Sequence, residues 1–149
     1  MEKLSRNYHL KLQEMCSCYL ETNFQELLSA MVFHKSADVE EDAFKYLSLA
    51  ILAALTEKAK KLSFKKGKDT TKITIKAKER KIKLPSPSQD LIDKIIAITR
   101  AITHLEEDKG ECPLVLGLQN DQVELLVKVK KDKEKESIKF EFPDIENLN

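Results

Sequence analysis

The cysteines and histidines are the first side chains to test for chemistry, because thiolates and imidazoles bind metals and act as nucleophiles or bases. Cys16 and Cys18 lie close to His9 in the sequence. On a helix, residues two apart point about 200° away from each other, so the two thiols do not converge on one ion. No second ligand pair is spaced for zinc, and Cys16 falls on an apolar stripe as a small core residue. We therefore expect no metal site.

A second pair, Cys112 and His104, can act as nucleophile and base if the fold brings them together. The surrounding sequence has no recognisable orienting acid or oxyanion hole. The acidic cluster Glu106, Glu107 and Asp108 can bind a cation or transfer protons, but it also suits a solvated loop. A loop and a histidine at a helix end account for these residues without catalysis. The sequence therefore predicts no enzyme, no catalytic residue and no cofactor.

The strongest charge feature runs from Lys58 to Lys83, with twelve basic side chains against Asp69 and Glu79. Such a stretch can bind nucleic-acid phosphates, an anionic membrane or an acidic partner. Phe64 is its single aromatic residue, so the stretch has almost no side chain on which nucleic-acid bases could stack. The candidate anion-binding residues are Lys72, Lys76, Lys78, Lys81 and Lys83.

The structural explanation of the same lysines is a solvated strand face that resists edge-to-edge aggregation. The chain as a whole has a net charge of only +1, which favours this explanation over a nucleic-acid site. Both interpretations stay open on the sequence alone.

Length and composition set the class of protein. The 149 residues suit one domain with a helical extension, and a hydrophobic content of 42% can build a core. No run approaches the roughly 20 apolar residues that span a bilayer, and the N-terminus has no apolar signal core. Three cysteines, an odd number, argue against a disulfide framework. We expect a cytoplasmic protein without a membrane span.

The elements that position these side chains begin with residues 3–33. Apolar residues recur there at steps of three and four without Gly or Pro, which predicts one long helix. Its apolar stripe needs a partner surface, either this protein's own body or another chain. The candidate partner-binding residues are Leu20, Phe24, Leu27 and Met31.

The sequence then predicts an alternation of helices and strands. After a break at 34–37, Asp38 and Glu41 form a capping box for a helix that runs to Ala59. Ser86 and Pro87 start a second helix, which extends to Leu105. Strands are expected at the following positions: 62–64, 73–77, 82–84, 114–118, 123–129 and 138–142.

These elements predict an α+β fold. We expect a small antiparallel or mixed sheet with helices on one face, because the strands carry charge on alternate positions and so have one wet face. We expect the long N-terminal helix in addition to this sheet and its helices. The expected organisation is an N-terminal helical segment at 1–37, an α+β domain at 38–143 and a frayed tail at 144–149.

The order of elements from 44 to 142 resembles the domain that precedes the motor domain in type II secretion and type IV pilus assembly ATPases. The corresponding segments are 44–61, 62–64, 73–84, 85–105, Gly110 and 114–142. Where that family has arginines that help close the domain onto nucleotide, this chain has Lys76 to Glu79, Glu111 and Leu126. The three glycines also lack the spacing of a P-loop.

The resemblance implies the scaffold and a binding role rather than ATP hydrolysis. It predicts a non-catalytic protein–protein interaction or regulatory module that binds itself or an assembly ATPase. The alternative is a nucleic-acid-binding module that uses the basic face from Lys58 to Lys83.

Overall fold

The computed structural model describes residues 2–33, 38–118 and 121–143. The helices are α1 (Glu2–Cys18), α2 (Phe24–Phe33), α3 (Val39–Thr56) and α4 (Gln89–Thr103). The strands are β1 (Lys61–Lys66), β2 (Thr71–Lys76), β3 (Lys81–Leu84), β4 (Lys109–Leu118), β5 (Asp121–Asp132) and β6 (Lys135–Glu141). All six strands pair antiparallel in one sheet with the order β3-β2-β1-β6-β5-β4.

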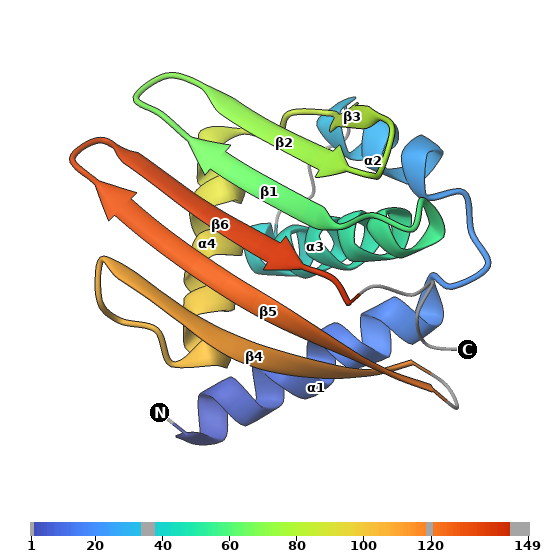
Figure 1. The fold of residues 1–149 in the computed structure, drawn as a ribbon, viewed down its shortest axis with the longest axis horizontal. Helices are drawn as coiled ribbons and strands as arrows, with labels where there is room; N and C mark the ends of the chain where they lie inside the picture. The colour runs from blue at the N-terminus through green and yellow to red at the C-terminus, as the bar shows by residue number, and fades with distance from the viewer. Residues whose placement is uncertain (1, 34–37, 119–120, 144–149) are drawn as a thin grey trace.

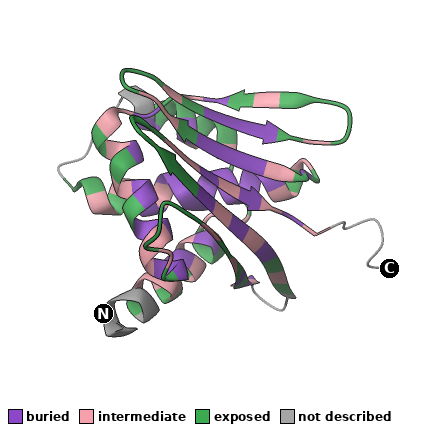
Figure 2. Cartoon of the chain, turned by 60° about the vertical axis from the view of Figure 1, so that its left-hand side comes forward, coloured by how far each residue is buried: buried purple, intermediate pink, exposed green. Residues whose placement is uncertain are grey.

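The molecule has two layers. The helices that the structure describes lie behind the sheet in Figure 1, and the viewer looks onto the opposite face of the strands. Buried residues alternate with more exposed ones along β4 and β6, whereas β1 and β2 each bury three consecutive residues, 62–64 and 73–75. Figure 2 shows the strands coloured by burial. The predicted α+β fold with helices on one face is confirmed, and its sheet is antiparallel.

The core lies between the sheet and α3. Every residue of this helix from Ala43 to Ala54 is buried except Lys45, which makes eleven buried residues. The helix is therefore covered on several sides, as its wide apolar surface predicts. Aromatic rings join the two layers: Phe64 of β1 stands edge-on to Tyr46 of α3 and to Phe140 of β6, at centroid distances of 6.3 and 5.9 Å. The two central strands and α3 therefore share one packed core.

Helix α4 has the expected buried stripe, and its Ile95, Ile98 and Ile102 are all buried. Its start differs from the prediction. Ser88, not Ser86, is the N-cap and accepts a hydrogen bond from the Leu91 amide at 3.2 Å. Because two prolines precede this position, the backbone stays extended until Ser88 and the helix begins at the next residue. The Ser86 hydroxyl instead donates to the Thr71 carbonyl of β2 at 3.0 Å.

The single helix predicted for residues 3–33 is wrong, because the structure has two helices there. The break lies at 19–23, where the side chain of Asn23 accepts from the Glu26 amide and caps α2. Periodicity alone misses this break because the apolar stripe continues through it. Both helices pack on α3, and α1 also contacts α4 and β4.

Helix α1 also closes the outer edge of β4. The amide of Gly117 donates to the side-chain oxygen of Gln13 at 2.7 Å, and His9 Nε2 lies 2.7 Å from the Val115 carbonyl. These contacts occupy backbone groups that an edge strand otherwise leaves free for another strand to pair with.

Strand β4 begins earlier than predicted. The sequence predicts a strand only from residue 114, but Gly110 and Pro113 also lie inside this ten-residue strand. An edge position tolerates proline, because one side of the strand makes no ladder hydrogen bonds. Two predictions lie outside the described residues: the break at 34–37 and the frayed tail at 144–149. Within the described ranges, the structure contains no helix that is long and apolar enough to cross a membrane.

Candidate anion-binding face

The side of the sheet away from the helices is here called the open face. Side chains at i and i+2 of a strand share a face, and so do cross-strand partners, so the registers assign each residue to a side. The lysines of the open face are Lys61, Lys65, Lys72, Lys76, Lys81, Lys83, Lys109, Lys128, Lys130, Lys135 and Lys139. Its acidic residues are Glu111, Glu124, Asp132 and Glu141. The face is therefore strongly basic.

Four of the five predicted anion-binding residues lie on this face: Lys72, Lys76, Lys81 and Lys83. The fifth, Lys78, lies in the turn between β2 and β3. The sequence prediction missed the lysines of β4, β5 and β6, which lie more than 20 residues beyond the basic stretch. Their signal is the alternation of lysine with buried valine, isoleucine and phenylalanine along β5 and β6.

The open-face residues form rows that run across the strands. One row near the β1–β2 and β5–β6 turns, here the hairpin-end row, reads Lys72, Lys65, Ser137, Lys130, Lys109. The open-face pair Asp132 and Lys135 lies one step closer to the β5–β6 turn. The middle row reads Lys83, Thr74, Ser63, Lys139, Lys128, Glu111. The row at the other end, here the far row, reads Lys81, Lys76, Lys61, Glu141, Leu126, Pro113.

Two hollows mark the hairpin end of the sheet. One has a volume of about 460 Å³ and lies between the two hairpin turns, with Lys65, Lys72 and Lys135 among its lining residues. The other has a volume of about 340 Å³ and extends towards β4. Both include Lys130, Ser137 and Lys139, so they adjoin each other along β5 and β6.

Lys139 lies at the centre of this charge cluster. Partial burial lowers the pKa of its ammonium group below the ordinary value of 10.5, and the nearby charges of Lys61 and Lys65 lower it further. The carboxylate of Glu141 acts in the opposite direction. Burial and the neighbouring ammonium groups therefore both disfavour the charged form of Lys139.

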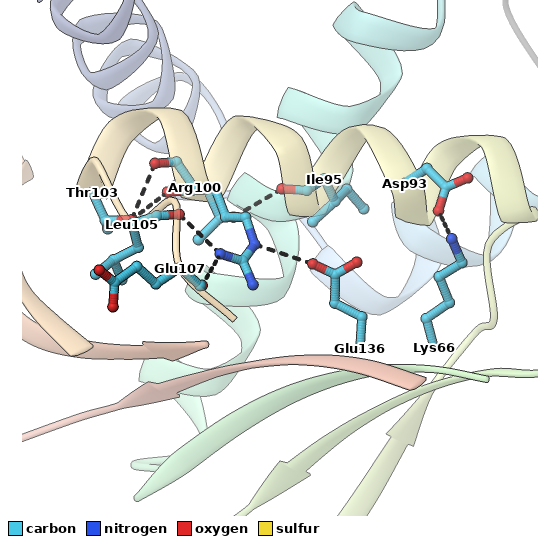
Figure 3. Close-up of polar contacts among 9 residues, drawn as sticks. Lys66, Asp93, Ile95, Arg100, Thr103, Leu105, Glu107 and Glu136 are labelled. Carbon is cyan, nitrogen blue, oxygen red and sulfur yellow. Dashed lines mark hydrogen bonds and ion pairs between the residues drawn. The ribbon is translucent and has the colours of Figure 1, made fainter. Parts of the chain in front are cut away.

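Helix α4 fixes the strands that carry these lysines (Figure 3). Asp93 pairs with Lys66 at the end of β1, and Arg100 pairs with Glu136 of β6 at 3.1 Å. The guanidinium of Arg100 also donates to the carbonyls of Leu105 and Glu107, at 2.9 and 2.7 Å. Since Lys66 and Glu136 point to the helix side, their neighbours in the strands face the open side. The ion pairs thus anchor the hairpin end without using its open-face charges.

The thiols near the N-terminus and His9 lie in different surroundings. Cys16 is buried, and burial raises the pKa of its thiol to about 11, whereas Cys18 is exposed. His9 contacts the β4 backbone. Among the residues that the structure describes, no group of three or more metal-ligating side chains could hold an ion.

The two residues of the second candidate pair lie in different elements: His104 at the end of α4 and Cys112 in β4. His104 has a left-handed backbone, with φ of 59°, and is the C-cap of α4. The Cys112 thiol contacts the Pro113 carbonyl at 3.3 Å. In the acidic cluster, all three side chains are exposed, and the backbone carbonyl of Asp108 accepts from the Lys131 amide at 2.7 Å. The backbone of this segment, which lies between α4 and β4 in the chain, is therefore bonded to β5.

The candidate partner-binding stripe packs against the protein's own core. Met31 is buried, and Leu20, Phe24 and Leu27 are partly buried against the same cluster as α3. These side chains therefore have contacts inside the chain, whereas the lysines of the open face have one side in solvent.

Comparison with known proteins identifies no family for this chain. Its sequence matches no protein-family model, and a search of curated proteins finds no match either. The resemblance to the secretion-ATPase domain consequently stays a prediction from the order of elements.

Proposed function

We propose that this protein is a non-catalytic module that binds the phosphate backbone of nucleic acids on the open face of its sheet. The observation that carries the proposal is the charge of this face, where eleven lysines stand among four acidic residues. The chain has a net charge of only +1, so the remaining surface is acidic and directs a polyanion to this side.

The arrangement favours nucleic acid over an acidic protein or a membrane. Antiparallel strands place the lysines on a lattice with about 4.8 Å between strands and about 7 Å along them, which suits a polymer with regularly repeated charges. The hydroxyl of Ser137, which is partly exposed, lies among these lysines and can donate to a phosphate oxygen. The hairpin-end row and the middle row contain no apolar side chain that could insert into a bilayer.

The mode of binding follows from the side chains present. The described open-face positions of the six strands carry no aromatic residue for base stacking and no arginine for bidentate reading of guanine. Lysine ammonium groups act as point charges. Binding should therefore depend on phosphates, be insensitive to base sequence and weaken steeply with salt.

Fluorescence anisotropy with a labelled duplex of about 20 base pairs tests the proposal. The dissociation constant should rise steeply between about 50 and 200 mM salt, with little difference between two unrelated sequences. Replacing Lys65, Lys130 and Lys139 with glutamine should weaken binding at least about tenfold. Absence of binding at 50 mM salt, or binding that salt does not change, would refute the proposal.

A matched control removes the same charge from the helix side. Lys11, Lys45 and Lys94 belong to α1, α3 and α4, and their replacement with glutamine should leave duplex binding within about twofold of the wild type. If both triple variants lose affinity equally, binding reflects the net charge of the chain rather than the open face.

Association with itself or with an assembly ATPase stays a separate prediction, because it rests on the sequence resemblance. Co-purification of the full chain with a motor ATPase tests it directly.

A further inference from the structure

We infer that the bound phosphate chain crosses the sheet along the hairpin-end row, at right angles to the strands, rather than spreading evenly over the open face. This inference rests on the proposed function and adds where and in what direction the ligand lies.

The first reason is the continuity of charge in this row. It carries four lysines and Ser137 across five adjacent strands, and none of its five positions is acidic. At about 4.8 Å between strands, its ends at Lys72 and Lys109 are about 19 Å apart. A row of this length can contact several consecutive phosphates of one backbone.

The other two rows are interrupted. In the far row, Glu141 occupies the centre, and Leu126 and Pro113 follow it towards β4. The middle row ends at Glu111, and its Lys128 already pairs with Glu141 at 3.1 Å. An anion that followed either row would therefore meet a carboxylate, which repels it.

The second reason is the shape of the surface. All five members of the hairpin-end row line the two adjoining hollows: Lys65 and Lys72 line the first, Lys109 lines the second, and Lys130 and Ser137 line both. No member of the far row lines either of them. The depression therefore follows the hairpin-end row, and Asp132 and Glu136 at the first hollow and Glu111 at the second also border it.

The third reason is rigidity at this end of the sheet. The ion pairs Lys66–Asp93 and Arg100–Glu136 attach β1 and β6 to α4 at positions next to Lys65 and Ser137 (Figure 3). Strands held in this way present their lysines with less ordering cost on binding.

Two triple variants with the same loss of charge test the inference. One replaces Lys65, Lys72 and Lys130 of the hairpin-end row with glutamine, and the other replaces Lys61, Lys76 and Lys81 of the far row. We expect the hairpin-end variant to lose at least about tenfold in duplex affinity and to reduce the salt slope by about 3, since each lost phosphate contact contributes about 0.9. The far-row variant should lose less than about threefold.

A single substitution provides an independent measurement if the triple variants fold poorly. Ser137→Asp places a carboxylate at the centre of the row and should weaken binding at least about tenfold, whereas the neutral Ser137→Asn should bind within about threefold of the wild type. Circular dichroism and thermal unfolding verify that each variant is folded.

The outcomes separate the two proposals. Two results would refute the path along the hairpin-end row: equal losses in the two triple variants, or a Ser137→Asp variant that binds like the wild type. Either result would leave the open face as the binding surface. Failure of the wild type to bind duplex in a salt-dependent way would refute the proposed function itself.

Discussion

At the scale of single residues, Lys139 occupies a place in the sheet that disfavours its charged form. Burial and the neighbouring charges of Lys61 and Lys65 both lower the pKa of its ammonium group, which means that they disfavour its charged form. Since this pKa is lower in the folded chain than the ordinary 10.5, the cost is present at neutral pH and diminishes as the pH rises towards 10.5. A bound phosphate would offset the same cost.

The first prediction at this scale concerns Lys139→Gln. The variant should unfold about 1–2 °C higher than the wild type near pH 7, because it removes charge repulsion, and it should bind duplex less tightly. Thermal unfolding and anisotropy measure the two effects. Lys139→Arg retains the charge and serves as the control. A Lys139→Gln variant that melts below the wild type would contradict this account of the residue.

At the scale of elements, α4 connects the core to the binding face. Its buried stripe packs against the sheet, while Asp93 and Arg100 hold the strand ends that surround the hollows. A loss of packing in α4 should therefore affect both stability and the placement of the lysines.

The prediction for this element is that Ile98→Ala lowers the free energy of unfolding by about 2–5 kcal/mol, because Ile98 is fully buried and its removal leaves a cavity. Urea denaturation measures the change. Ala97 is exposed on the same helix, so Ala97→Gln should alter stability by less than about 0.5 kcal/mol. A loss below half a kcal/mol in Ile98→Ala would show that this face is not packed as described.

At the scale of the whole molecule, charge and hydrophobic surface are separated. The open face concentrates lysines, and the helical layer encloses the apolar residues that the sequence suggests as a partner surface. Phe24 and Leu27 are partly buried against the core, so they have a structural role irrespective of any self-association.

The prediction for the molecule is that replacing Phe24 and Leu27 together with glutamate lowers the free energy of unfolding by about 2 kcal/mol or more, because two charges enter a largely apolar contact. Light scattering measures the oligomeric state alongside denaturation. If the wild type is a dimer and the variant is an equally stable monomer, the stripe is an interface rather than part of the core.

Local patterns in the sequence determined much of this fold. The alternation of isoleucine and alanine with threonine and lysine at 73–78 predicts a half-buried strand, and the stripe through Ile95, Ile98 and Ile102 predicts a helix buried on one side. Both predictions are confirmed, because the period of a side-chain pattern reflects the geometry of the element that contains it.

Only the tertiary structure decided which lysines lie together. Pairing of β1 with β6 places Lys65 beside Ser137, and pairing of β4 with β5 places Lys109 beside Lys130. These partners are set by packing of the whole sheet on α3 and α4, since alternation fixes the face of a side chain but not the strand next to it. The sequence therefore identified a basic stretch, whereas the fold extended it into a row across five strands.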